Sequence, residues 1–187
     1  MRRRDTTWYE ELRGRYRPED LRIILIAESP PDPGSAERRF FYAPRLTHDN
    51  LYRGVADALY GDEPSFDLRA KRAVLDRISA DGYWLIDAVE HPINRDSRSA
   101  RRAAIKAATP ALVERCQDHD PRRGVIICHA EVYKAAASPL RQADIAVLHD
   151  EPLPFPLGNW RAKFVRGFRQ ALQRGSPSAD DDDKRLP

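Results

Sequence analysis

Four short apolar runs along the chain predict buried strands. The first, Ile23 to Ile26, is rich in β-branched side chains and ends abruptly at polar residues. Continuous runs of this kind are typical of strands that are buried on both faces of a parallel sheet. The other three runs cover residues 83–86, 124–128 and 145–148.

Hydrophobic positions recur at helical spacing between these runs. They predict helices over residues 5–16, about 49–60, about 67–80, 98–116, 130–137 and about 161–173. Asp5 or Thr6 can cap the first helix, because short polar side chains accept hydrogen bonds from a helix N-terminus. Asp49 or Thr47 can cap the second in the same way, and Pro110 should kink or divide the fourth. The alternation of strands and helices predicts an α/β fold, a three-layer α/β/α sandwich around a four-stranded parallel sheet.

The length and the cysteine content bound the class of protein. A chain of 187 residues fits one domain with a sizeable core, which we expect to cover residues 1–174. It has no apolar run near ~20 residues, so we expect no membrane span, and no signal-peptide core follows the basic first residues. Two cysteines are too few for a disulfide framework or a four-cysteine metal site. We therefore expect a cytoplasmic protein without a metal or cofactor.

Charge is unevenly distributed along the chain. The whole chain has 32 basic and 29 acidic residues, and its last twelve residues hold four Asp, one Lys and one Arg. The rest therefore carries 30 basic and 25 acidic side chains. An arginine-rich body favours phosphate contacts, although a solvated surface has the same composition. Residues 175–187 are expected to be a disordered acidic tail, and the Asp-Asp-Asp-Asp-Lys within it resembles a protease site added by engineering.

Polar side chains follow three of the four predicted strands. Glu28 and Ser29 come directly after the first strand, Asp87 ends the second, and His149 follows the fourth. Because parallel strands bring their carboxyl ends to one edge of a sheet, these side chains should line a common ligand cleft. Each also has a simpler explanation, since an Asp often caps a loop and a His often completes a hydrogen-bond network.

A long connection between residues 32 and 47 carries aromatic side chains beside arginines. Its centre reads Arg38-Arg39-Phe40-Phe41-Tyr42. Long loops inside compact domains are often functional, and such a segment could stack on a base and contact a phosphate. The same aromatic side chains could instead anchor the loop to the core.

The order of these motifs resembles that of the uracil-DNA glycosylase superfamily. Residues 27–31, Ala-Glu-Ser-Pro-Pro, are similar to its first motif, of the Gly-Glu-Ala-Pro-Gly type. Residues 85–89 and 92–95 resemble the stretch that carries a base-reading amide and a proline turn. Residues 149–153 resemble the third motif, of the His-Pro-Ser type. The resemblance covers about residues 21–173 and implies a four-stranded parallel sheet between helices and a role in base-excision repair.

The resemblance also implies roles for individual side chains. A glycosylase extrudes its target nucleotide and stabilises the charge that develops on the leaving base. Glu28 would orient or activate water, and His149 would donate to a base carbonyl. Ser29, Phe40 or Phe41, and Asp87 would contact the base. Three basic residues near the strand-end loops are candidates for salt-dependent contacts with the DNA backbone, namely Arg95, Arg161 and Lys163. A monomer is the simpler expectation for such an enzyme.

The departures from the family pattern bear on the substrate. Ala27 and Pro31 stand where the family prefers glycines, and Ser29 stands where its most active members carry a water-activating Asp. Asp87 replaces the usual Asn. An ionised carboxylate only accepts hydrogen bonds, whereas an amide both donates and accepts. We therefore expect a base with an amino group to suit the pocket better than uracil.

Two other readings remain open from the sequence. A protein with the same fold could bind a nucleotide or nucleic acid without cleaving it. A small-molecule hydrolase of unrelated lineage could use Glu28 and His149, since fold alone does not fix function.

Overall fold

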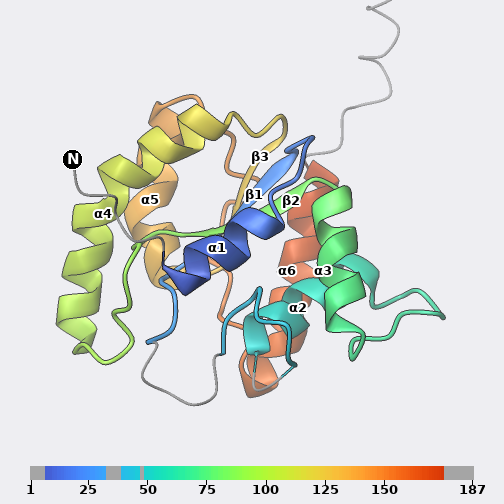
Figure 1. Ribbon diagram of the computed structural model, residues 1–187. Coiled ribbons are helices and arrows are strands. Elements are labelled where there is room, and N and C mark those ends of the chain that lie inside the picture. The colour runs from blue at the N-terminus through green and yellow to red at the C-terminus, as the bar shows by residue number, and fades with distance from the viewer. Residues whose placement is uncertain (1–6, 33–38, 47–48, 175–187) are drawn as a thin grey trace, which may run out of the picture.

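The computed structural model describes residues 7–32, 39–46 and 49–174. These residues form a mixed α/β structure around a parallel sheet of three strands in the order β2-β1-β3 (Figure 1). The strands are β1 (Ile23–Ala27), β2 (Tyr83–Asp87) and β3 (Gly124–Ile127). All three coincide with apolar runs that the sequence predicts as strands, which confirms the α/β class.

Helices cover both sides of this sheet (Figure 1). They are α1 (Trp8–Arg15), α2 (Asn50–Tyr60), α3 (Lys71–Ala80), α4 (Arg98–His119), α5 (Ala130–Gln142) and α6 (Arg161–Arg174), with a 3₁₀ turn, η1 (Gly158–Trp160), before the last. Helix α4 packs against α5 on one side, whereas α2 and α6 pack together on the other side with α3. None of the described helices is both long and apolar enough to cross a membrane.

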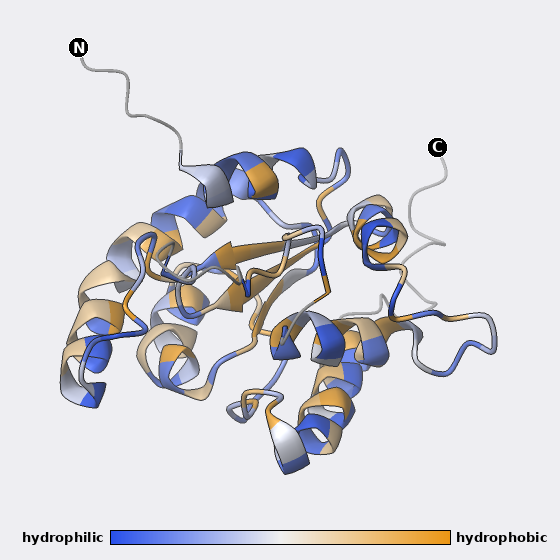
Figure 2. Cartoon of the chain, turned by 60° about the horizontal axis from the view of Figure 1, so that its bottom comes forward, coloured by the Kyte–Doolittle hydropathy of each residue, from blue (hydrophilic) through white to orange (hydrophobic). Residues whose placement is uncertain are grey.

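The sheet forms the centre of the hydrophobic core. Every residue of β1 and β3 is buried, as expected for strands with helices on both faces. Figure 2 shows the strands as a largely hydrophobic layer between helices whose outer faces are hydrophilic. Phe164 and Phe168 of α6 are fully buried, as their spacing predicts, and Leu172 is partly buried.

The predicted fourth strand is wrong as a full strand. Residues 145–148 run beside β3 but form only an isolated parallel bridge between Val125 and Val147. Two main-chain hydrogen bonds flank it, from Val125 N to Ala146 O (2.8 Å) and from Leu148 N to Val125 O (3.0 Å). The next β3 amide, Ile127 N, donates to the imidazole of His149 instead (2.9 Å). A side chain therefore replaces the next backbone partner, and the pairing ends.

The helix ends also differ in places from the prediction. Helix α4 continues through Pro110 to His119 without division, and α5 runs five residues further than predicted, through Pro139. Asp49 caps α2 as expected, with its carboxylate accepting from Tyr52 N. Thr7 is the N-cap of α1, whereas the other proposed caps, Asp5, Thr6 and Thr47, lie outside the described residues, as do Arg38 and the tail.

Candidate functional site

The register of the sheet aligns the carboxyl ends of its three strands. Ala27 pairs with Asp87, and Ile26 pairs with Ile127. Glu28 lies two residues after Ile26, and His129 lies two residues after Ile127, so both follow the ends of their strands. The strands thus bring Asp87, Glu28 and His129 to the same edge of the sheet, where open α/β folds bind ligands.

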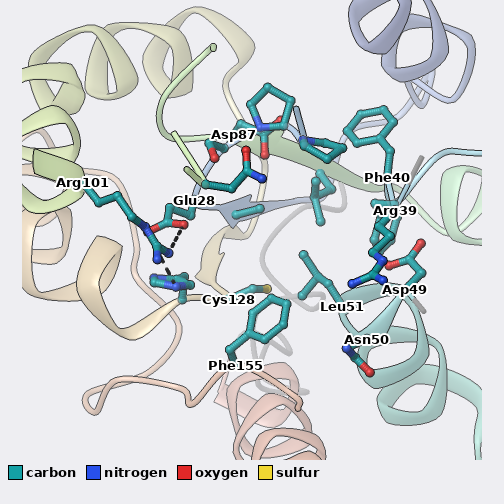
Figure 3. A pocket seen from close by; sticks show the side chains of 18 residues that line it. Glu28, Arg39, Phe40, Asp49, Asn50, Leu51, Asp87, Arg101, Cys128 and Phe155 are labelled. Carbon is teal, nitrogen blue, oxygen red and sulfur yellow. Dashed lines mark hydrogen bonds and ion pairs between the residues drawn. The ribbon is translucent and has the colours of Figure 1, made fainter. Parts of the chain in front are cut away.

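A cavity of about 330 Å³ lies at this edge. Its wall combines the strand ends with Ser29, Phe40, Phe41, the N-terminal residues of α2 and Phe155. In Figure 3, Glu28 and Arg101 lie on one side, Phe40 and Asp49 on the other, and Phe155 closes the pocket from a third. The volume falls at the lower end of the range for small-ligand sites.

Glu28 is held by an arginine. The Arg101 guanidinium of α4 donates through Nε to Oε1 (3.2 Å) and through Nη2 to Oε2 (2.5 Å) of Glu28 (Figure 3). His129 Nε2 lies 3.8 Å from the same Oε1. The Glu28 side chain keeps 13 % of its area exposed. A carboxylate, a guanidinium and an imidazole therefore meet in the pocket.

Asp87 is more deeply buried than Glu28 and also has an arginine partner. It is 2 % exposed, and its Oδ2 accepts a hydrogen bond from Arg13 Nη2 of helix α1. Burial raises the pKa of Asp87 to about 6, although the neighbouring Arg13 opposes this shift. The carboxyl is therefore ionised at neutral pH and loses its charge in mildly acidic solution.

Phe40 and Phe41 anchor their loop to the core, and both rings also lie in the pocket wall. Both are 3 % exposed and line the pocket. The Phe40 ring packs edge-on against Trp8, and the Phe41 ring packs edge-on against Tyr52. They anchor their loop to the core while presenting part of their surface to the cavity.

A buried ion pair lies beside these rings, and its acidic member, Asp49, is itself part of the pocket wall. Lys71 Nζ is 2.7 Å from Asp49 Oδ2 and donates to Phe40 O (3.2 Å). It also lies 4.8 Å from the centroid of the Tyr52 ring. The two charged side chains are 1 % and 4 % exposed. This pair joins the Phe40 turn, the N-terminus of α2 and the start of α3.

His149, predicted to be catalytic, does not line this pocket. Its Nε2 accepts the Ile127 amide (2.9 Å), and its Nδ1 lies 2.7 Å from Glu151 O. A neutral imidazole that accepts a hydrogen bond at Nε2 carries its proton on Nδ1. The Nδ1–H group therefore donates a hydrogen bond to the Glu151 carbonyl. Both ring nitrogens are thus engaged in holding the chain, and the role of His149 as a donor to a base is corrected to a structural one.

We expect His149→Leu to lower the free energy of unfolding by about 1–3 kcal/mol at pH 7.5, because the Ile127 amide loses its buried partner. Burial lowers the pKa of His149 below its ordinary value near 6.5. The unfolded chain then takes up a proton first as the pH falls, so wild-type stability from this ring declines below about pH 6.5. Urea unfolding at several pH values should show that the difference in the free energy of unfolding between wild type and His149→Leu becomes smaller in acid. A difference that does not depend on pH would contradict a structural role for the neutral His149 ring.

The histidine in the pocket is His129, which the sequence reasoning missed. It lies two residues after Ile127, the last residue of β3, and is the N-cap residue of α5. Burial and the nearby Arg101 lower its pKa, whereas Glu28 raises it. Polar residues that follow the predicted strands, such as those after Ala27 and Ile86, are the candidates that the sequence indicates for the site. The same criterion applied to the third strand identifies His129.

The three residues proposed for DNA backbone contacts lie in different places. Arg95 is largely exposed and pairs with Asp32 (2.5 Å) beside the first strand-end loop. Arg161 of α6 instead contacts Asp57 of α2. Lys163 lines a second cavity between α6 and residues 148–154, and its Nζ lies 5.6 Å from the Trp160 ring centroid. None of the three lines the strand-end pocket itself, although Arg95 directly follows Asn94, which does.

Comparisons with protein-family models, curated proteins and solved structures found no match for this chain. Among the described residues, no group of three or more His, Cys, Asp or Glu side chains could hold a metal ion.

Proposed function

We propose that this chain is a DNA-glycosylase-like protein that binds a nucleobase in the strand-end pocket and excises a deaminated or damaged base. The observation that carries the proposal is the convergence of Glu28, Asp87 and His129 on one cavity with the Phe40 and Phe41 rings in its wall. Such a site offers apolar surface for a planar base and polar groups for its edge.

The proposed reaction is hydrolysis of the N-glycosidic bond. Water attacks the sugar carbon, the bond to the base breaks, and its electron pair leaves with the base. Glu28 orients the water and accepts its proton, and Ser29 lies beside it in the pocket wall. His129 takes the role that the family resemblance implies for His149 and stabilises the charge on the departing base.

Asp87 supports a preference for bases with an amino group. An ionised carboxylate accepts hydrogen bonds from an amino group but faces the carbonyl of uracil without a proton to donate. DNA is the proposed partner and a monomer the proposed state, with Arg95 next to the pocket as a candidate phosphate contact. The proposed contacts of Arg161 and Lys163 would need a longer DNA footprint over α6.

A second candidate function is binding without cleavage. Arg101 holds Glu28 through two hydrogen bonds, and Arg13 holds Asp87. Because Arg101 engages both carboxylate oxygens of Glu28, a Glu28 that stays paired is less available to a water molecule in the pocket. A nucleotide or nucleic-acid binding module with the same fold fits this pairing.

Oligonucleotides that carry one uracil, one hypoxanthine or one 5-hydroxycytosine, an oxidised base that keeps its amino group, distinguish the two functions. We expect abasic sites to form mainly from 5-hydroxycytosine, about 10- to 100-fold faster than from uracil, because a hydrogen bond to a charged group is worth about 1.5–3 kcal/mol. Abasic sites are measured by alkaline cleavage, and binding is measured by fluorescence anisotropy over a salt series.

Binding with a steep salt dependence but without abasic sites would favour the binding module. Efficient uracil release that disappears in Asp87→Ala would refute the amino-group preference. The absence of both binding and cleavage would refute both functions.

A further inference from the structure

Asp87 presents only part of its carboxylate to the pocket. Arg13 Nη2 engages Oδ2, whereas Oδ1 has no hydrogen-bond partner within the part of the chain that the structure describes. The main-chain oxygens of Asp87 and Ala88 accept hydrogen bonds from Arg115 Nη2 (3.0 and 3.1 Å). The end of β2 is therefore held from α1 and α4, and one carboxylate oxygen remains for a ligand.

Arg13 is itself fixed in place, and it lies behind the pocket wall. Its side chain is 9 % exposed, and its guanidinium lies 6.0 Å from the centroid of the Phe40 ring. Its carbonyl accepts the indole N–H of Trp84 (3.1 Å). Arg13 is not among the residues that line the cavity. It can therefore act on a ligand only through the residues that it contacts.

We propose that Arg13 determines the base specificity of the pocket by keeping Asp87 charged and aligned as an acceptor for an exocyclic amino group. This inference rests on the proposed nucleobase site. With Arg13 in place, the pocket selects a base with an amino group over the matching base with a carbonyl.

The charges around Asp87 give the direction of the effect. Burial raises its pKa, Arg13 is the strongest opposing influence, Arg115 acts in the same direction as Arg13, and Glu28 raises the pKa further. Removal of Arg13 therefore favours the protonated form at neutral pH. A protonated carboxyl donates a hydrogen bond, which suits a base carbonyl. The same side chain would then select the opposite base.

Cytosine and uracil test this proposal, because they differ at position 4 by an amino group and a carbonyl. We expect the wild-type protein at pH 7.5 to bind free cytosine more tightly than uracil in NMR titrations, and this preference to fade below about pH 6. In Arg13→Met the cytosine-to-uracil affinity ratio should fall about tenfold at pH 7.5, which corresponds to one unit of pKa. The pH at which the preference fades should rise accordingly, and Arg13→Lys should restore part of the ratio.

The variant Asp87→Asn provides a second test, because it removes the charge of the side chain but keeps its shape. It should remove the pH dependence of the ratio, and Arg13→Met should not change the ratio further in that background, since both residues act through one carboxylate. If Arg13→Met does not fold, Arg13→Lys and the pH dependence of the ratio in Asp87→Asn still test the proposal.

A ratio unchanged in a folded Arg13→Met variant would overturn the role of Arg13 while leaving a nucleobase pocket. Binding of neither base by the wild-type protein would overturn the proposed site, and the inference with it.

Discussion

Replacing Glu28 with Gln is expected to slow base release by about 100- to 10,000-fold, the range that one positioned acid or base contributes. Gln keeps the size of the side chain and an oxygen for Arg101, but it cannot accept a proton from water. The rate is measured as abasic sites formed in the 5-hydroxycytosine oligonucleotide under single-turnover conditions, where substrate binding does not limit the reaction.

Glu131→Gln provides the matched control. Glu131 of α5 also pairs with an arginine of α4, since Arg102 Nε donates to its Oε2 (2.7 Å), but it does not line the pocket. We expect this variant to keep the wild-type rate, and His149→Leu to do so wherever it remains folded. An unchanged rate in Glu28→Gln would remove Glu28 from the mechanism, and equal losses in both Glu variants would indicate a general structural effect.

Lys71→Met is expected to lower the free energy of unfolding by about 3–5 kcal/mol, because it leaves a buried carboxylate without its cation. Asp49 would remain 96 % buried, and the Phe40 carbonyl would lose a donor at the same time. Urea unfolding monitored by tryptophan fluorescence gives the change as a shift in the transition midpoint. A Phe40 loop loosened in this way should also weaken binding in the pocket.

Two further variants separate the charge effect from the loss of a long side chain. In Lys71→Met with Asp49→Asn the buried charge is gone while a polar cap for α2 remains, so we expect much of the lost stability to return. Lys134→Met removes an exposed lysine that pairs with Glu131 and should change stability by less than about 1 kcal/mol. Similar losses in Lys71→Met and Lys134→Met would contradict a special role for the buried pair.

The strands and most helices could be predicted because their signals are local. Residues 23–26 form a continuous apolar run, and such a run by itself indicates a strand that is buried on both faces. The end of the fourth strand could not be predicted. Its pairing stops because the imidazole of His149 occupies the Ile127 amide, and no pattern within residues 145–148 records where that amide points.

The site could be predicted in part for the same reason. Glu28 and Asp87 reach the cavity because strand ends converge, which follows from topology alone. His129 and His149 each follow an apolar segment, and only the three-dimensional structure shows which ring faces the cavity. The arginine partners of the two carboxylates lie 73 and 74 residues away in the sequence, so local patterns do not reveal them.

The position of helix α1 has a consequence for the amino end of the chain. Trp8 packs on Phe40, and Arg13 holds Asp87, so this helix supports the pocket from outside although it does not line it. A protease cut after Tyr16 would therefore leave every lining residue in the chain. It would still release the helix that supports Phe40 and Asp87. A ligand that binds only the intact pocket should in turn slow such cleavage, because it stabilises the form in which α1 is docked.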